Sequence, residues 1–398
     1  MRRFIHLPLL LILASCAPAE RSAAAPDPAP EAVAAGEFPD GEIRNLVILI
    51  GDGVGTAYWT AARFETGRLH VERMPVAGLT DTRSSDSYVS DSAAGATVYA
   101  TGRRTYNGAI GVGDRCAEMF AADSVAVMQD PASCDPLEGI FDIAYRAGIA
   151  TGLVASSSIT HATPAAFGAK VPYRRHQAEI AEQMAENPID VLLGGGKGFF
   201  DGTLRDDERD LWTPLCREAV CLTTPAEFER YGPDDRRLVG LFAENHMEAA
   251  PERRPTLPEM TRVALERLDR NPAGFFVMIE GSQPDWRGHA NDPLPDVVSE
   301  MVDFDETVGV ALDFAERTPG TLVLVVADHE TGGLALQMEA DTLTAAYTTG
   351  GHTGAMTPHF AWGPGAERFS GIRDNDEIGR VLMDIARRRE AAVQGAID

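Results

Sequence analysis

The stretch "NLVILIGDG", residues 45–53, decides the fold class, because it is an apolar run that ends in glycines. Such a run is typical of a strand buried on both faces of a parallel sheet. Similar apolar runs cover residues 148–158, 189–196, 274–281 and 321–330, and helical patterns between them cover residues 173–186, 257–270, 296–317 and 375–389. This alternation predicts an α/β fold with a mainly parallel central sheet and helices on both faces.

The composition limits the classes of partner. The 398 residues are 44% hydrophobic, which is enough to bury a full core, and they carry a formal net charge of −25. This acidity argues against nucleic acid or an anionic membrane surface as a partner. An anionic substrate would need local positive charge, which metal ions or arginines could supply.

The N-terminus has the features of an export signal. A basic start, "MRRF", precedes an apolar run, "LPLLLILA", that is too short to span a bilayer. "LASC", residues 13–16, is similar to a bacterial lipobox, in which Cys16 becomes the lipidated first residue. We therefore expect a lipoprotein-type signal peptide over residues 1–15 and an exported, lipid-anchored protein of the periplasm or cell envelope. The alternative is an ordinary signal peptide with an incidental cysteine.

Residues 16–40 are rich in Ala and Pro and are expected to form a flexible tether, so that the folded domain covers residues 41–398. Two charged, loop-rich stretches near 104–138 and 198–256 are typical of insertions, and each contains two cysteines. Four cysteines in an exported protein indicate two disulfides, for which three pairings exist. The local pairs, Cys116–Cys134 and Cys216–Cys221, are favoured because each lies within one insertion.

Carboxylates, histidines and a threonine follow four of the apolar runs. They are Asp52, then His161 and Thr163, then Glu280, Asp285 and His289, and finally Asp328 and His329. Ligands of open α/β sheets bind at the carboxyl ends of the strands. A single Asp after a strand is usually a turn residue or a helix cap, but four runs ending in oxygen and nitrogen donors indicate a ligand site.

The donor types indicate metals. Asp285 and His289 are four residues apart, within reach of one ion, and His352 adds an imidazole in a glycine-rich loop. Mixed Asp and His sets suit zinc, whereas an all-oxygen set suits Mg²⁺. The glycines of "GDGVG" lack the spacing of nucleotide-binding loops, and we interpret them as a tight turn that exposes Asp52.

One hydroxyl stands beside one carboxylate in "YVSDSAAGATVYATG", residues 88–102. Taken alone, Asp91 and Ser92 at the head of a helix would be N-cap residues. In a chain with this many metal donors, Ser92 is also a candidate nucleophile.

These residues belong to seven ordered motifs by which the chain resembles the alkaline phosphatases from about Asn45 to Ile385. The motifs are "IGDGVG", "SDSAAGATVYATG", "RTYNGAIGV", "HATPAAF", "IEGSQPDWRGH", "ADHETGG" and "GGHTG". The resemblance implies an alkaline-phosphatase-like catalytic domain. Only a short stretch separates His329 from His352, where some members carry an accessory crown, so a reduced crown region is expected.

The resemblance also implies a role for each matching residue. Ser92 is the nucleophile, Arg174, eleven residues after Thr163, clamps phosphate, and Asp91 orients Arg174. Asp285, His289 and His352 hold one zinc, Asp52, Asp328 and His329 hold a second, and Asp52, Thr163 and Glu280 hold magnesium. His161 and Trp286 stand at substrate-positioning places where some members carry an acid and a lysine, which leaves Mg²⁺ or Zn²⁺ open at the third site.

The implied activity is hydrolysis of small phosphate monoesters through a phosphoserine, with two Zn²⁺ and one Mg²⁺ per chain, broad specificity, an alkaline optimum and a homodimer as the candidate assembly. Sulfatases share the broad fold, but "DSAAGA" lacks their Cys/Ser-x-Pro-x-Arg setting. Phosphoglycerate mutases have similar ligands, but the export signal argues against a glycolytic enzyme. A phosphodiesterase is the nearest enzymatic alternative. A non-catalytic phosphate-binding lipoprotein is disfavoured because no ligand or nucleophile is missing.

Overall fold

The computed structural model describes residues 42–395. The predicted signal peptide, the tether and Cys16 lie outside the described residues. Within them, no helix is both long enough and apolar enough to cross a membrane.

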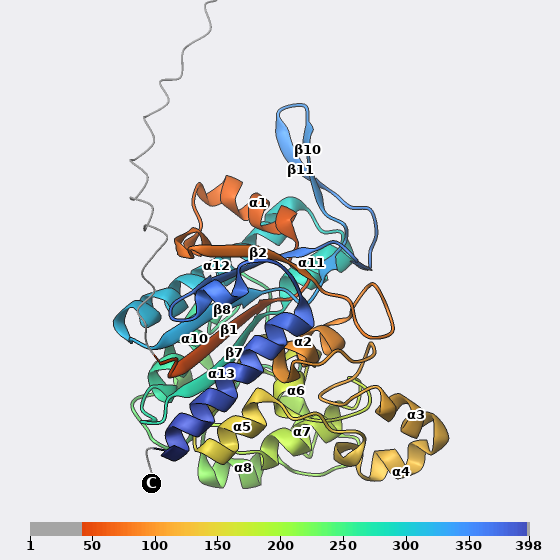
Figure 1. The fold of residues 1–398 in the computed structure, drawn as a ribbon, viewed down its shortest axis with the longest axis vertical. Coiled ribbons are helices and arrows are strands. Elements are labelled where there is room, and N and C mark those ends of the chain that lie inside the picture. Colours follow the sequence, from red (N-terminus) through yellow and green to blue (C-terminus); the bar gives the residue numbers. More distant parts are fainter. Residues whose placement is uncertain (1–41, 396–398) are drawn as a thin grey trace, which may run out of the picture. The chain divides into compact units, whose positions relative to one another are not determined.

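A ten-stranded sheet forms the centre of the fold (Figure 1). Its strand order is β14-β2-β13-β8-β1-β7-β3-β4-β6-β5. In this order the strands are β14 (Gly371–Asp374), β2 (Val76–Asp81), β13 (Thr357–Trp362), β8 (Thr321–Val326), β1 (Asn45–Gly51), β7 (Phe275–Gly281), β3 (Ala150–Ser158), β4 (Val191–Gly195), β6 (Arg237–Leu241) and β5 (Ala219–Leu222). Only β13 pairs antiparallel with its neighbours in this described sheet, so the prediction of a mainly parallel sheet is confirmed.

The strand β1 lies at the middle of the sheet and is buried along its whole length. Its residues alternate between two apolar clusters: Leu46, Ile48 and Ile50 enter one, and Val47 and Leu49 enter the other. Burial on both faces explains why residues 45–51 are continuously apolar rather than alternating with polar residues.

Helices cover both faces of the sheet, as predicted. One cluster includes side chains of α2 (Ser92–Thr101), α5 (Ile140–Ala147), α6 (Ala162–Gly168), α7 (Gln177–Glu186) and α13 (Asn375–Gly395). The other includes α1 (Thr56–Thr66), α10 (Leu257–Leu268) and α12 (Leu294–Arg317). The helix predicted from residue 173 begins only at Gln177, because the preceding residues form a loop in which the backbone N–H of Arg174 donates to Gly108 O.

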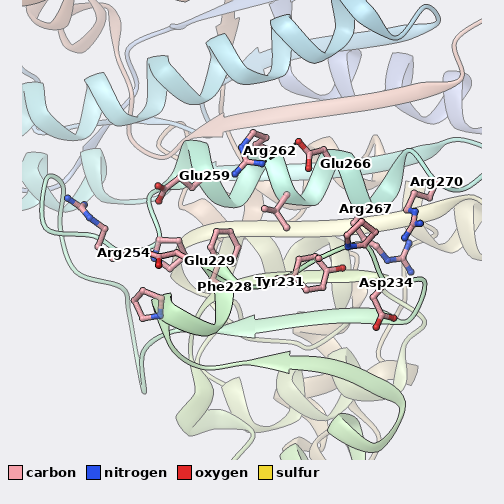
Figure 2. A pocket seen from close by; sticks show the side chains of 15 residues that line it. Phe228, Glu229, Tyr231, Asp234, Arg254, Glu259, Arg262, Glu266, Arg267 and Arg270 are labelled. Atoms are coloured by element: carbon pink, nitrogen blue, oxygen red, sulfur yellow. Dashed lines mark hydrogen bonds and ion pairs between the residues drawn. The ribbon is translucent and has the colours of Figure 1, made fainter.

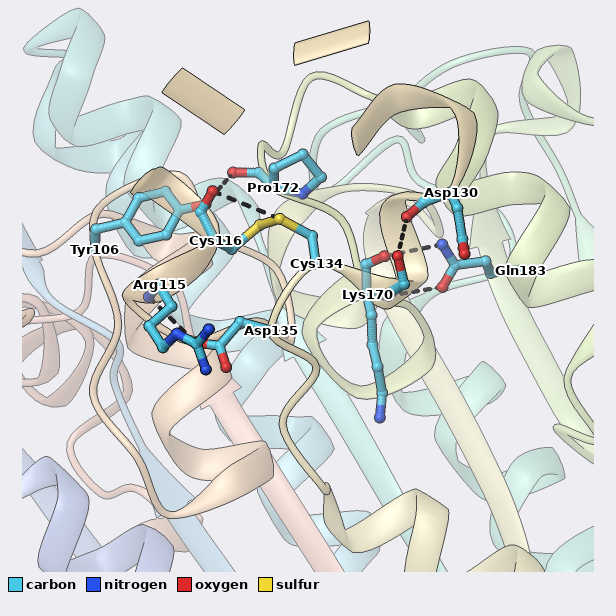
Figure 3. Close-up of a disulfide and its surroundings, with 10 residues drawn as sticks. Tyr106, Arg115, Cys116, Asp130, Cys134, Asp135, Lys170, Pro172 and Gln183 are labelled. Atoms are coloured by element: carbon cyan, nitrogen blue, oxygen red, sulfur yellow. Dashed lines mark hydrogen bonds between the residues drawn. A yellow bond between two sulfur atoms is a disulfide. The ribbon is translucent and has the colours of Figure 1, made fainter. Parts of the chain in front are cut away.

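The stretch 104–138 contains α3 (Arg115–Ala122) and α4 (Ser124–Gln129), and the disulfide Cys116–Cys134 closes it (Figure 3). The stretch 198–256 contains α8 (Trp212–Glu218) and α9 (Pro225–Glu229), and Cys216–Cys221 joins α8 to β5. Both favoured disulfides are therefore present. The second stretch is less loop-rich than expected, because its strands β5 and β6 extend the central sheet beyond β4.

Between His329 and His352 the chain forms β9 (Glu330–Thr331), the hairpin β10 (Ala335–Glu339) and β11 (Thr342–Ala346), and then β12 (His352–Thr353). The hairpin projects from the body of the domain (Figure 1). His352 does not lie in an open glycine-rich loop, because β12 pairs antiparallel with β9, where His352 is opposite Thr331. This pairing places His352 beside Thr331, two residues after His329.

Candidate functional site

The predicted donors converge where β3, β7, β1 and β8 end. The register places Ile50 of β1 beside Glu280 of β7 and beside Val326 of β8. Three groups have ligand atoms that all lie within 4.8 Å of one another: Asp285, His289 and His352; Asp52, Asp285 and His329; and Asp52, His161 and Glu280. Adjacent parallel strands therefore bring together donors that are far apart in sequence.

In the first group, His289 Nε2 lies 3.0 Å from His352 Nε2, and Asp285 Oδ1 lies 3.4 Å and 3.6 Å from these two atoms. The helix α11 (Gln283–Ala290) places Asp285 and His289 one turn apart. The Nδ1 atoms donate to carbonyls, His289 to Gly350 O at 2.7 Å and His352 to Ser90 O at 2.8 Å. Each Nε2 therefore carries a lone pair, the form in which imidazole binds metal.

In the second group, His329 Nε2 lies 3.4 Å from Asp52 Oδ1 and 3.5 Å from Asp328 Oδ2. Thr331, which the sequence did not single out, accepts from His329 Nδ1 at 3.2 Å and donates to Asp285 Oδ1 at 2.5 Å. It thereby orients one residue of each of the first two groups. Its position two residues after His329 in "DHET" was the available signal.

The interpretation of "GDGVG" as a turn that exposes Asp52 is wrong, because the Asp52 side chain is 0% exposed. Gly53 has φ +72°, and a Cβ there would lie 2.8 Å from Asp285 Cα. The glycine therefore allows a close approach of the turn to α11, which covers the carboxylate instead of exposing it.

In the third group, Glu280 Oε2 accepts from Ser157 Oγ at 3.1 Å and from Ser282 Oγ at 2.6 Å. Several buried polar atoms of the site have no hydrogen-bond partner among the described residues: Asp52 Oδ2, Asp328 Oδ2, Glu280 Oε1, Thr163 Oγ1 and His161 Nδ1. Buried polar atoms without partners are costly, and bound cations are one way in which proteins satisfy them. The donor set therefore fits metal ions.

The electrostatics of the site support the same conclusion. Burial raises the pKa of Glu280 to about 7, and burial together with Asp285 raises the pKa of Asp328 to about 6. Burial, followed by the charges of Asp328 and Asp285, raises the pKa of Asp52 well above its usual value. Burial lowers the pKa of His329 to about 3. The carboxylates repel one another, whereas the imidazole is already in its neutral, ligating form.

The N-cap interpretation is confirmed for Asp91, whereas Ser92 is the first residue of α2. Asp91 is the N-cap of α2: its Oδ1 accepts from Ala94 N and from Gly108 N, both at 3.0 Å. Its Oδ2 accepts from Arg174 Nη1 at 3.0 Å. Burial opposes the charge of Asp91, but Arg174 and the two backbone N–H groups outweigh burial and lower the pKa of Asp91.

The Oγ of Ser92 lies at the centre of the site. It is 3.2 Å from His329 Nε2, 3.4 Å from Arg174 Nη1 and 3.5 Å from Asp52 Oδ1. The first turn of α2 lies this close to the other site residues because it is built from small residues. A Cβ at Gly95, for example, would lie only 2.8 Å from the Asp328 side chain.

One ring, that of His161, contacts Arg174, and two further rings pack against His161. His161 Nε2 lies 3.3 Å from Arg174 Nη2, and burial together with the Arg174 cation lowers the pKa of His161 well below its usual value. The rings of His161, Trp286 and His246 pack edge to face. The sequence did not single out His246, which lies in the stretch 198–256 and outside every recognised motif.

A separate cavity of about 600 Å³ lies between α10 and the segment that follows α9 (Figure 2). Its walls include four arginines, Arg254, Arg262, Arg267 and Arg270, and four acids, Glu229, Asp234, Glu259 and Glu266. Its lining thus carries equal numbers of formal positive and negative side chains. None of the predicted site residues lines it.

Comparisons with known proteins agree with the geometry. Residues 43–346 match the sequence model of the family described as "Alkaline phosphatase". Alkaline phosphatase 3 of Bacillus subtilis is 31% identical over 85% of this chain and 88% of its own length. The alkaline phosphatase of the Antarctic bacterium TAB5 superposes with a TM-score of 0.78 at 35% identity, over 87% of this chain and 99% of that one.

A structure of a His-to-Glu variant of the Antarctic enzyme, with Mg bound in its M3 site, superposes with a TM-score of 0.75 at 35% identity. It covers 87% of this chain and 98% of that one.

Proposed function

This chain belongs to the alkaline phosphatase family, and from that premise we propose how its described residues hydrolyse phosphate monoesters. The overall reaction consumes water and a phosphate monoester and releases an alcohol and inorganic phosphate. The observation that carries the proposal is the position of Ser92 Oγ, which lies within 3.5 Å of a histidine, an aspartate and the guanidinium of Arg174.

Ser92 is the nucleophile of this proposal. Its Oγ attacks phosphorus, the bond between phosphorus and the ester oxygen breaks, and the alcohol leaves with the serine proton. Water then attacks the phosphoserine, which releases inorganic phosphate and restores the hydroxyl. The position of Ser92 at the start of α2 supports this role, because the helix N-terminus favours negative charge on the phosphoryl group.

The metal content we propose is two Zn²⁺ and one Mg²⁺ per chain. Asp285, His289 and His352 would hold one zinc, Asp52, Asp328 and His329 the second, and Asp52, Thr163 and Glu280 the magnesium. When bound, such cations stabilise charge on the attacking and leaving oxygens. In the Antarctic enzyme, magnesium occupies the M3 site of a variant in which Glu replaces a His. His161 adds a nitrogen donor to the third group of this chain, so metal analysis has to decide between Mg²⁺ and Zn²⁺.

Arg174 is the proposed phosphate clamp. Its two terminal nitrogens can bind two phosphoryl oxygens at once, a geometry that lysine cannot reproduce. The ion pair with Asp91 and the contact with His161 fix the plane of the guanidinium before substrate arrives. Trp286 packs edge to face on His161, and both are proposed to position the substrate. The interactions proposed here address the phosphoryl group, so we expect broad specificity. We also expect an alkaline optimum, because the imidazole ligands bind metal only when they are neutral.

Anchoring at Cys16, an envelope or periplasmic location and a homodimeric assembly complete the proposal. The supporting feature is the lipobox-like "LASC" of residues 13–16. Cys16→Ser should move the enzyme into the soluble fraction, or leave it unprocessed, with unchanged specific activity. A fully soluble parent protein without an acyl group would contradict the anchor, and sedimentation of the purified domain would test the dimer.

The reaction is tested with an aryl phosphomonoester, an aryl phosphodiester and a chelator. The monoester should be hydrolysed much faster than the diester, and metal-free protein, checked by elemental analysis, should be inactive. Zinc with magnesium should restore activity better than either metal alone. Acid quenching with labelled phosphate should place the label on the peptide that contains Ser92. An active metal-free protein, or a label on another residue, would overturn the proposal.

A further inference from the structure

A loop from the stretch 198–256 lies directly on the edge of the sheet that carries the site. It contains Asn245 and His246 and follows β6. A Cβ at Gly195 would lie 2.2 Å from Asn245 O, so only glycine permits this close contact. The loop therefore packs against the end of β4 without an intervening side chain.

Hydrogen bonds and a buried ion pair hold the loop. Gln283 Nε2 donates to Met247 O at 2.9 Å and to Ser156 O at 3.0 Å, which joins the loop to α11 and β3. Farther along, Ala250 N donates to Glu300 Oε1 at 2.8 Å. Glu300 pairs with Arg253 at 2.7 Å, and both side chains are only 1% exposed. With its polar groups paired in this way, the loop is a fixed part of the wall of the site.

His246 extends from this loop toward the phosphate clamp. Its Nδ1 accepts from the backbone N–H of Ser158 at 3.1 Å, which fixes the orientation of the ring. The ring centroid lies 5.5 Å from that of His161, with the planes at 90°, and 4.6 Å from that of Trp286, with the planes at 64°. His246 thus fills the space on one side of His161, whose Nε2 lies 3.3 Å from Arg174 Nη2.

We propose that His246 is a positioning residue of the phosphate clamp: its ring confines the imidazole of His161, and His161 in turn holds the Arg174 guanidinium in the orientation that binds phosphate. The inference rests on the proposed function, in which Arg174 binds the phosphoryl group. Closely packed rings have few alternative orientations, so removing one ring frees its neighbour. A freed His161 would leave Arg174 with more orientations to lose when phosphate binds.

Two substitutions separate the ring from its hydrogen bond. His246→Asn removes the ring but retains an oxygen that can accept from Ser158 N. His246→Phe retains a ring of similar size but leaves that N–H without its acceptor. Each zinc- and magnesium-loaded variant is titrated with inorganic phosphate by calorimetry, and its thermal unfolding and its KM and kcat for an aryl phosphomonoester are measured.

His246→Asn should raise the phosphate Kd and the KM by about threefold to tenfold, with little change in Tm and no loss of kcat. His246→Phe should lower Tm while its phosphate Kd stays within about twofold of the parent value. Asn245→Ala, an exposed neighbour in the same loop, serves as the matched control and should change neither quantity. If His246→Asn does not fold, His246→Gln, which also removes the ring, is used in its place.

Arg174→Ala separates this proposal from the one it rests on. In an Arg174→Ala background, His246→Asn should have no further effect on the phosphate Kd, because the two residues act in series. If the phosphate Kd is unchanged in His246→Asn but raised in Arg174→Ala, only the role of His246 is overturned. An unchanged Kd in Arg174→Ala overturns both that role and the clamp.

Discussion

His289 Nε2 and His352 Nε2 face each other 3.0 Å apart, although 63 residues separate them in the chain. The other nitrogen of each ring donates to a backbone carbonyl, so two lone pairs point at one another with Asp285 beside them. Two lone pairs at this distance repel, and a cation between them turns the repulsion into coordination. His352→Ala should therefore reduce the zinc content by one ion per chain and lower activity strongly. Elemental analysis of the purified variant, with His359→Ala as a histidine control away from the site, provides the measurement.

Ser92→Ala should abolish most turnover while the fold and the metal content remain. The hydroxyl contributes no hydrogen bond on which the start of α2 depends, because Asp91 caps that helix. Circular dichroism and metal analysis serve as controls for a kinetic assay at saturating substrate. Turnover close to the parent rate over many cycles would rule out Ser92 as the nucleophile.

Arg174→Lys should weaken inhibition by inorganic phosphate although the charge is retained. Loss of the two-pronged contact is expected to cost about 1–3 kcal/mol, the range for hydrogen bonds to charged groups. Asp91→Asn should have a smaller effect in the same direction, because it removes the charge that orients Arg174 but leaves an oxygen to cap α2. Inhibition constants at fixed pH and ionic strength decide, and equal constants for Arg174→Lys and the parent would refute the clamp.

The apparent affinity for metal should rise with pH through the range of about 6 to 7 and level off only above it. In metal-free protein, Glu280 with a pKa of about 7 and Asp328 with a pKa of about 6 hold protons below those values. A cation must displace these protons, so binding is weaker on the acid side of this window. His329 contributes little to this pH dependence, because its pKa of about 3 leaves it neutral throughout. Titrations with zinc and magnesium from about pH 5.5 to about pH 8.5 test the sign, which a flat profile would contradict.

Removing the disulfide Cys116–Cys134 should weaken phosphate binding as well as stability. The braced segment contacts the loop that carries the clamp. Tyr106 Oη donates to Pro172 O at 2.8 Å (Figure 3). Arg174 N donates to Gly108 O at 2.8 Å. The double Ser variant of Cys116 and Cys134 should lose ~3 kcal/mol of stability through loop-closure entropy. The double Ser variant of Cys216 and Cys221, which opens a shorter loop, should lose ~2 kcal/mol. Only the first variant should raise the phosphate inhibition constant. Equal constants in both variants would show that the brace does not reach Arg174.

Sequence patterns predicted the middle of the sheet because burial there leaves a local signature. Five continuous apolar runs correspond to β1, β3, β4, β7 and β8. The strands at both sides of the sheet were missed. β13 begins with Thr357 and Pro358, and β6 begins with Arg237 and continues as a short apolar run, so neither has a distinctive pattern. Their pairing is decided by partners that are distant in the chain.

The same contrast holds at the site. Residues such as Asp52 and His329 lie in recognisable motifs beside strand ends, so their positions followed from the sequence. His246 has no such context: it reaches the site because Gly195 lets a distant loop approach within contact of β4. The start of α7 was also predicted too early. The helical pattern of the sequence extends back to residue 173, but the backbone N–H of Arg174 donates to Gly108 O, so this segment forms a loop.

The parallel register of β1, β7 and β8 has a consequence for changes in chain length. Ile50 lies beside both Glu280 and Val326. The distances between the carboxylates of the site are therefore set by the spacing and register of hydrogen-bonded strands. Deleting one residue within 45–51 would turn Asp52 toward the opposite face and remove it from two donor groups at once. The hairpin of β10 and β11 carries none of these donors, so residues can be added to or removed from its tip while the carboxylates stay in place.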